Sequence, residues 1–140
     1  MDAARLFESA FAADPKLAAD FKTGHRYDAA CSAARAAAGD GVNAPADTSA
    51  RSALREKAFG WLRAEQELRR KQAASAQAAE RDLAVATLAH WQEDTDLSSV
   101  RDPGPLAKLP DAEREEWEKL WADVKATLAD AQKPPPPAGK

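Results

Sequence analysis

Histidine and cysteine, the side chains that most often bind zinc, occur at three positions of this 140-residue chain. They are His25, Cys31 and His90. His25 and Cys31 are six residues apart, so a helix would carry them on different faces, and neither a Cys-x-x-Cys nor a His-x-x-x-His spacing occurs. We therefore expect no metal site and no cofactor. Cys31 lies among alanines, which favours a small, buried thiol.

Catalytic groups are equally sparse. Nucleophilic catalysis needs a serine or cysteine beside a positioned histidine, and no spacing in the sequence suggests such a pair. The carboxylates Glu113, Glu115, Glu116 and Glu118 are dense enough to suggest acid–base chemistry, but they fall at the start of a predicted helix. Acidic side chains there stabilise the positive end of the helix dipole, so a solvated first turn is the better explanation. We expect a protein without enzymatic activity.

The basic run Arg69-Arg70-Lys71 has the charge to contact phosphate. Glu65 and Glu67 precede it at the four-residue spacing that pairs Glu65 with Arg69 and Glu67 with Lys71 along a helix. We therefore expect an outer, solvated helix face rather than a phosphate site. The net charge of -3 gives no broad attraction to nucleic acid, so no nucleic-acid partner is expected.

The composition predicts an all-α fold. Hydrophobic residues make up 44% of the chain, and much of that share is alanine, the strongest helix former. There are four valines and no isoleucine, so almost no strand is expected. A single cysteine rules out an internal disulfide and fits a reducing compartment. No apolar run reaches the ~18 residues of a membrane span, and the first residues lack a signal-peptide layout, so we expect a cytoplasmic protein with no membrane partner.

Apolar residues recur at helical spacing in about five segments. A cap at Asp47, Thr48 or Ser49 starts the third of these helices, and Pro110 starts the fifth. The expected helices cover about residues 2–13, 25–38, 49–74, a segment that ends near residue 91, and 110–132, with a further turn or helical piece at 16–22.

Two connecting segments are expected between the later helices. Residues 73–79, rich in alanine, serine and glutamine, fit either a helix–helix corner or continuous helix. Residues 92–109 are predicted to be irregular, with the strongest turn signal at 102–105. A connection this long is ordered only if its apolar residues enter the core. Those residues are Leu97, Val100, Leu106 and Leu109.

Large aromatic side chains mark the predicted core. The four tryptophans have the chemistry of an aromatic peptide cage, but each lies on an apolar stripe, so burial is the better interpretation. The predicted structural core contains Phe7, Tyr27, Trp61, Trp91, Trp117 and Trp121. The inner stripes of the third and fourth helices are predicted as Leu54, Ala58, Trp61, Leu62 and Leu68, and as Leu83, Ala84, Thr87, Leu88 and Trp91.

The first segment carries the spacing of a helical repeat. Ala3, Phe7, Ala10 and Pro15 match the second helix of a tetratricopeptide repeat (TPR), in which small residues let two helices touch and proline ends the helix. The next segment, residues 26–33, resembles the opening helix of a following repeat.

The second half resembles a narrower group. The strings at residues 59–65, 90–97, 100–103, 106–110 and 116–124 are similar to the C-terminal region of planctomycete TPR proteins, many of which follow a eukaryotic-like Ser/Thr protein kinase domain. No kinase motif occurs in this chain. The resemblance implies TPR-like hairpins in a right-handed solenoid fragment, closed by a Trp-rich C-terminal capping helix. It also implies upstream repeats of the same parent chain. The expected organisation is a degenerate TPR-like region at 1–48, a capping region at 49–132 that is compact with it, and a disordered proline-rich tail at 133–140.

This resemblance implies a non-enzymatic scaffold that binds a protein or peptide. TPR arrays bind along the first helix of each repeat, which here is the helix at 25–38. Its non-core residues Arg26, Asp28, Ser32 and Arg35 are therefore the candidate partner-binding residues, with ordinary solvated side chains as the alternative. Two other functions stay open: a purely structural cap of a longer TPR solenoid, and a regulatory tail of a Ser/Thr kinase.

Overall fold

The computed structural model describes residues 9, 10, 12, 13, 25–39 and 47–132. Within these ranges every regular element is a helix, which confirms the predicted all-α class. The four long helices are α3 (His25–Ala37), α4 (Thr48–Ala73), α5 (Ala78–Glu93) and α8 (Asp111–Gln132).

Several predictions fall outside the described residues. They concern Phe7, most of the helix at 2–13, the piece at 16–22 and the tail at 133–140. The motif residues Ala3 and Pro15 lie outside as well.

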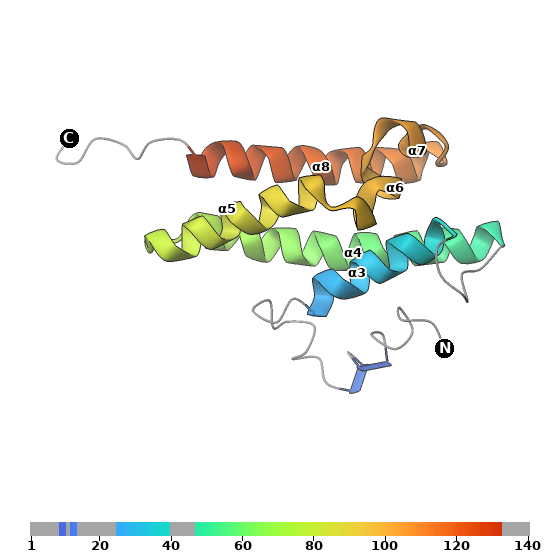
Figure 1. Cartoon of the computed structure of the whole chain (residues 1–140), viewed down its shortest axis with the longest axis horizontal. Helices are drawn as coiled ribbons and strands as arrows, with labels where there is room; N and C mark the ends of the chain where they lie inside the picture. The colour runs from blue at the N-terminus through green and yellow to red at the C-terminus, as the bar shows by residue number, and fades with distance from the viewer. Residues whose placement is uncertain (1–8, 11, 14–24, 40–46, 133–140) are drawn as a thin grey trace.

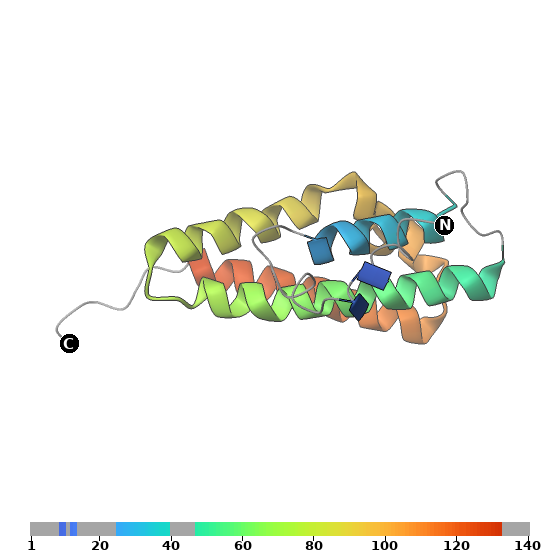
Figure 2. The same ribbon diagram turned by 90° about the horizontal axis from the view of Figure 1, so that it is seen from below.

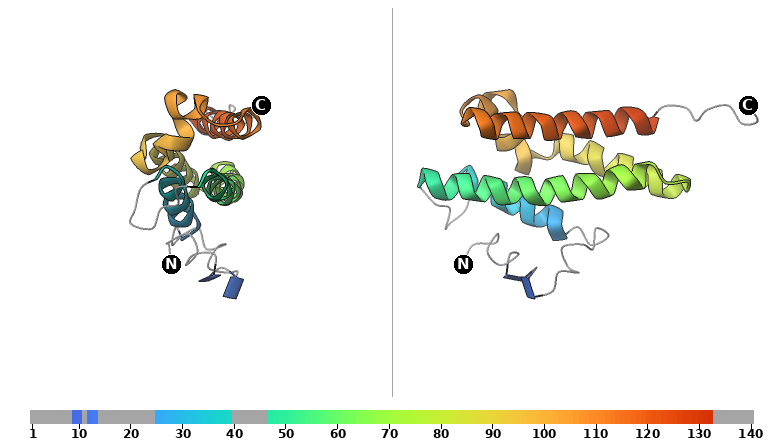
Figure 3. Two further views of the ribbon diagram at one scale, coloured as in Figure 1. Left: turned by 90° about the vertical axis from the view of Figure 1, so that its right-hand side faces the viewer. Right: turned by 180° about the vertical axis from the view of Figure 1, so that it is seen from behind.

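The long helices lie along a common direction. α3, α4 and α5 alternate in direction along the chain, whereas α8 runs the same way as α4 (Figure 1). Figure 2 shows the antiparallel pair of α4 and α5. Viewed end-on, α4 and α8 lie on one side of the bundle and α3 and α5 on the other (Figure 3). α4 packs against α3, α5 and α8, so it is the central helix of the described part.

The ends of α3 and α4 follow the residues that the sequence offers there. Gly39 has a φ of 94°, a left-handed conformation that glycine adopts without strain, and its N–H donates to Ala36 O at 3.1 Å beyond the last turn of α3. Of the three predicted caps of α4, Asp47 is the one observed: its Oδ1 accepts from Ser49 N at 3.4 Å. The predicted second and third helices are therefore confirmed, to within a residue or two at each end.

A corner, not continuous helix, joins α4 to α5. α4 ends at Ala73 and α5 begins at Ala78. The corner is held by Arg81, whose Nη1 donates to Ser75 O at 2.8 Å, and by Gln77 N, which donates to Ser75 Oγ at 3.1 Å. This arrangement decides between the two alternatives for residues 73–79.

The segment at 92–109 is more regular than predicted. It holds a 3₁₀ turn, η1 (Thr95–Leu97), and two short helices, α6 (Ser98–Arg101) and α7 (Pro103–Ala107). The prediction of an irregular segment was wrong. The Asp94 side chain caps η1, and Pro103 starts α7, because proline is well suited to the first turn of a helix. The prediction that its apolar residues enter the core is confirmed for Leu97, Val100 and Leu106, while Leu109 is half-buried.

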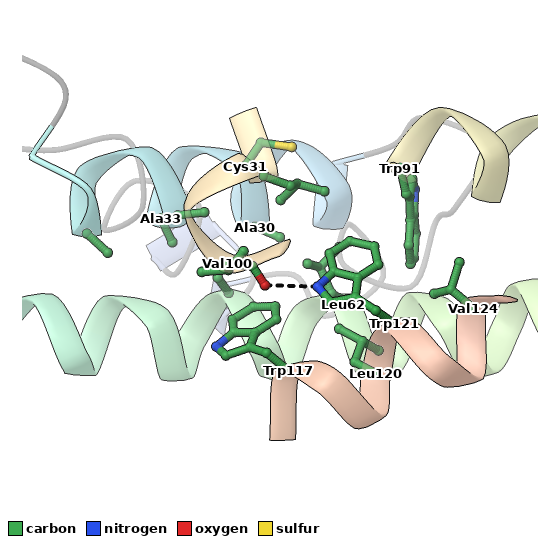
Figure 4. Packing of buried hydrophobic residues seen from close by; sticks show 14 of the residues in the cluster. Ala30, Cys31, Ala33, Leu62, Trp91, Val100, Trp117, Leu120, Trp121 and Val124 are labelled. Carbon is green, nitrogen blue, oxygen red and sulfur yellow. Dashed lines mark hydrogen bonds between the residues drawn. The ribbon is translucent and has the colours of Figure 1, made fainter. Parts of the chain in front are cut away.

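The core lies between the four long helices and the short helices (Figure 4). Trp117 and Trp121 of α8 are buried there, and Trp121 Nε1 donates to Val100 O at 2.9 Å. Phe59 of α4 meets the Trp117 ring edge-on at 5.3 Å. The core prediction is thus confirmed for Trp91, Trp117 and Trp121, whereas Tyr27 and Trp61 are half-buried against that core.

Two predictions about helix faces were wrong. Leu83, expected to point inward, is 48% exposed, because Ala84, Leu88 and Trp91 occupy the inner stripe of α5 and Leu83 lies beside that stripe. Glu65 and Arg69, expected on a solvated face, are only 1% and 6% exposed. α4 has helices packed on three sides, so the buried arc of its surface is wider than a simple amphipathic stripe. For Glu67, Arg70 and Lys71 the solvated face is confirmed.

Candidate functional site

The four candidate partner-binding residues of α3 do not share one face. Asp28 and Arg35 are exposed and Ser32 is half-buried, and helical rotation places these three on the same side. Arg26 lies on the opposite side, where its side chain is 13% exposed and its Nη1 is 3.7 Å from Glu65 Oε1 of α4. The structure therefore brings Asp28, Ser32 and Arg35 together on one face of α3. Arg26 instead forms an ion pair with Glu65 inside the bundle. Partner binding by this helix stays a prediction.

A cluster of potentially reactive side chains lies where α3 meets the end of α5. Asp94 follows α5 in an extended conformation, and its Oδ1 caps η1 by accepting from Asp96 N at 2.9 Å. Its Oδ2 accepts from the Tyr27 hydroxyl and lies 3.9 Å from Cys31 Sγ and 3.3 Å from His90 Nε2. One carboxylate thus connects α3 to the corner after α5.

The aromatic rings and an arginine fix this corner. The Tyr27 ring stacks on Trp91 with ring centroids 5.4 Å apart and planes 8° apart, and it meets His90 edge-on at 6.2 Å. Arg101 Nη1 donates to Trp91 O at 2.9 Å and to Asp94 O at 2.6 Å. The first bond satisfies a carbonyl group in the last turn of α5, and the second adds to the bond that Asp94 O already accepts from Leu97 N at 3.1 Å.

The electrostatics of the cluster disfavour catalysis. Burial raises the pKa of Cys31 to about 12, so its thiolate is scarce at neutral pH. Burial and the bond to Asp94 also raise the pKa of Tyr27. For Asp94, burial acts to raise the pKa, but hydrogen bonds from Tyr27 and from the Asp96 amide outweigh it and the pKa is lowered. Asp94 is therefore a stable carboxylate, and Tyr27 and Cys31 keep their protons. These protonation states suit hydrogen bonds that hold α3 to the end of α5.

The same cluster has a partial set of metal ligands. Cys31 Sγ and one carboxylate oxygen each from Asp94 and Asp96 lie within 4.8 Å of one another. Thiolate and carboxylate together suit a borderline cation such as Zn²⁺. Such an ion would have to remove the thiol proton from Cys31 and would compete with the Tyr27 hydroxyl for the charge of Asp94. Those costs make the structural role the better explanation of these contacts.

A second polar group lies inside the contact between α3 and α4. Glu65 is 3.7 Å from Arg26 Nη1 and 3.9 Å from Arg69 Nε. Arg69 Nη1 donates to Gln72 Oε1 at 2.8 Å, and Gln72 Nε2 donates to Glu80 Oε2 of α5 at 2.9 Å. Burial raises the pKa of Glu65 and lowers the pKa of Arg69. This chain of contacts links three helices.

An open groove runs between α4 and α8 on the side away from α3 and α5. Two hollows of about 530 Å³ and 300 Å³ share Gln66, Glu67 and Asp123, so they form one continuous surface along the two helices. We call this surface the α4/α8 groove. It is lined by Phe59, Arg63, Gln66, Glu67, Arg70, Ala73, Ala74, Glu116, Lys119, Leu120, Asp123, Ala126, Thr127, Asp130 and Ala131.

Buried polar side chains hold the floor of the α4/α8 groove. Gln66 Nε2 donates to Thr127 Oγ1 at 2.9 Å and to Asp123 O at 3.3 Å, and Thr127 Oγ1 donates to Asp123 O at 2.9 Å. Gln66 and Thr127 are 5% and 7% exposed. The bonds fix the spacing of the two helices, so the groove is a formed feature of the fold.

The sequence does not predict this groove. Gln66 and Thr127 are polar residues at the edge of an apolar stripe, which is the available signal, but nothing in the sequence pairs the two positions, which are 61 residues apart. The alanines at 73, 74, 126 and 131 indicate only that these segments are helical.

No protein-family model, no curated protein and no solved structure matches this chain. Among the described residues, no helix is both long and apolar enough to cross a bilayer.

Proposed function

We propose that this chain is a non-enzymatic protein-interaction module and that the α4/α8 groove is its binding surface. The observation that carries the proposal is the continuous hollow between two helices whose spacing is fixed by buried hydrogen bonds. A groove between helices is the shape that receives an amphipathic helix from a partner.

The side chains that line the groove support this use. Ala73, Ala74, Ala126 and Ala131 are small, so the backbone of a bound helix approaches closely. Charged side chains stand along both rims, where charges contribute more to the choice and orientation of a partner than to affinity. Alanines and the buried Gln66 and Thr127 form the floor of the groove, and the charged side chains form its rims. A centre without charges and a charged rim is the general anatomy of a protein–protein interface.

The proposal keeps the scaffold role that the TPR resemblance implies and moves the binding surface from α3 to the α4/α8 groove. Antiparallel neighbours such as α3/α4 and α4/α5 are compatible with TPR-like hairpins. The alternative role, a terminal cap of a longer TPR solenoid, depends on the free face of the helix at 2–13, which lies mostly outside the described residues.

A library of displayed amphipathic helical peptides, selected on the full chain, tests the proposal. We expect selected peptides to shift the NMR signals of groove residues. Ala126→Glu, which places a charge in the groove, should weaken their binding about tenfold or more, since a buried unpaired charge opposes association. Ala129→Glu is the matched control, because Ala129 is also exposed on α8 but does not line the groove. Peptides that bind elsewhere, or two variants of equal effect, would refute the assignment.

A further inference from the structure

We propose that the occupant of the α4/α8 groove is a second copy of this chain, related to the first by a two-fold axis parallel to the two helices. This inference rests on the proposed function of the groove and names its partner. The observation that supports a dimer is the opposite charge of α4 and α8, the two helices that form the walls of the groove.

The charge difference between the walls is large. α4 has seven basic and three acidic side chains, a net charge of +4, and α8 has seven acidic and three basic side chains, a net charge of -4. At the groove itself, the α4 rim holds Arg63 and Arg70 with Glu67, and the α8 rim holds three carboxylates with one lysine. Those α8 residues are Glu116, Lys119, Asp123 and Asp130.

The opposite charges lie at matching levels along the groove. Arg70 lines the same hollow as Asp130, and Arg63 lines the same hollow as Glu116 and Asp123. A two-fold rotation about an axis parallel to the helices keeps every residue at its own level. It sets the α4 rim of one copy against the α8 rim of the other, so each arginine meets the acidic side chains at its level. A surface that is complementary to its own rotated image is what a symmetric dimer requires.

The contact that Arg70 makes within its own chain does not compete strongly with this arrangement. Arg70 is bonded to Glu67 three residues earlier, with both side chains more than half exposed. Exposed pairs of this kind contribute little to stability, so Arg70 can exchange this partner for a carboxylate of the second copy. The alanines of the floor let the two copies approach closely.

Charge reversal provides the test, with the full chain and sedimentation velocity over a range of concentrations. Arg63→Glu/Arg70→Glu makes both rims acidic, and Asp123→Lys/Asp130→Lys makes both rims basic; all four side chains are exposed. We expect the wild-type chain to dimerise and each variant alone to associate at least about tenfold more weakly, because like charges then face each other. An equimolar mixture of the two variants should restore a dimer. Circular dichroism checks that each variant keeps its helices.

Leu83→Gln is the control for the opposite side of the bundle and should leave the dimer unchanged. A wild-type chain that stays monomeric overturns the inference, as does a dimer that survives both reversals or a mixture that does not associate. If the chain is monomeric but helical peptides still bind in the groove, this inference fails and the proposed function stands. If neither a dimer nor a groove-binding peptide is found, both fail.

Discussion

Glu65 and Glu113 are both glutamates that join two helices through arginine, and their environments differ in an instructive way. Glu65, between α3 and α4, is 1% exposed and lies 3.7 Å and 3.9 Å from its two arginines. Glu113, between α4 and α8, is 21% exposed, and its two oxygens accept from Arg55 at 2.7 Å and 3.1 Å. Ser52 Oγ donates to the same carboxylate at 3.2 Å.

The pKa shifts of the two carboxyls are opposite in sign. Burial raises the pKa of Glu65 above its ordinary value, and Arg26 and Arg69 reduce this effect without cancelling it. Hydrogen bonds from Arg55 lower the pKa of Glu113 and outweigh its smaller desolvation. The number of nearby arginines therefore does not decide whether a carboxylate stabilises the fold. A carboxylate that accepts short hydrogen bonds at a partly solvated site stabilises it, whereas a fully buried carboxylate with distant arginines does not.

The largest expected effect is at Glu65. Glu65→Leu removes the carboxylate that lies 3.9 Å from the buried Arg69 guanidinium, and removing one partner of a buried ion pair costs about 3 kcal/mol. Urea unfolding followed by circular dichroism measures the loss. Adding Arg69→Met to the same chain should recover much of it, because the second charge is then removed as well. If the Glu65→Leu chain is as stable as the wild type, Glu65 contributes nothing to stability through its arginines.

Arg55 and Glu113 should show a smaller but directly favourable coupling. A double-mutant cycle with Arg55→Ala and Glu113→Ala is expected to give about 1.5 kcal/mol in favour of the pair, as for a charge-assisted bidentate contact with partial solvation. The measurement is the midpoint of urea unfolding for all four chains. A coupling near zero would remove the distinction between this pair and an ordinary surface pair.

The pH dependence of stability should differ in sign between the two sites. Because the folded pKa of Glu65 is raised, its favourable contribution is complete below the unfolded pKa, near 4.5, and is lost as pH rises through the folded value. The stability of the wild type relative to Glu65→Gln should therefore fall as pH rises from about 4.5 through the raised folded pKa of Glu65.

Because the folded pKa of Glu113 is lowered, its contribution is complete above about 4.5 and is lost as pH falls through the folded value. Wild-type stability relative to Glu113→Gln should fall as pH decreases. Unfolding series from acidic to neutral pH for the three chains measure both slopes. Slopes of the same sign at the two sites would contradict the comparison.

The smallest effect is expected at Glu67. Its pair with Arg70 is on the surface, with the two side chains 52% and 57% exposed, so Glu67→Ala should leave the urea midpoint unchanged within error. Glu67 is two residues from Glu65 on the same helix, which makes it a matched control for the substitution with the largest effect. A loss comparable to that of Glu65→Leu would show that burial is not the deciding variable.

The sequence predicts the helices well because their determinants are local. Asp47, Gly39 and Pro110 lie at or next to helix ends, and Trp117 and Trp121 are buried as predicted. Helical spacing also pairs Glu65 with Arg69 correctly, at 3.9 Å. It does not say whether that pair is solvated, because exposure depends on how many other helices pack against α4.

The contacts between distant segments are the part that could not be predicted. Tyr27 and Asp94 are separated by 67 residues and Gln66 and Thr127 by 61, and no periodicity connects such positions. The same limit applies to the α4/α8 groove, whose walls come from helices far apart in the chain. For the same reason, the sequence that predicts Arg26 and Arg35 as binding residues does not show that Arg26 lies 3.7 Å from Glu65 of the neighbouring helix.

The parallel direction of α4 and α8 has a consequence for the order of folding. Parallel neighbours cannot be joined by a tight turn, so residues 74–110, which include α5, must lead the chain back along α4 before α8 begins. Arg55 and Glu113 are 58 residues apart, whereas α4 and α5 meet across a corner of four residues, and short loops close at a smaller entropic cost. The α4–α5 hairpin should thus assemble first and α8 should dock last. The fluorescence of Trp117 and Trp121 would then report the final step of folding.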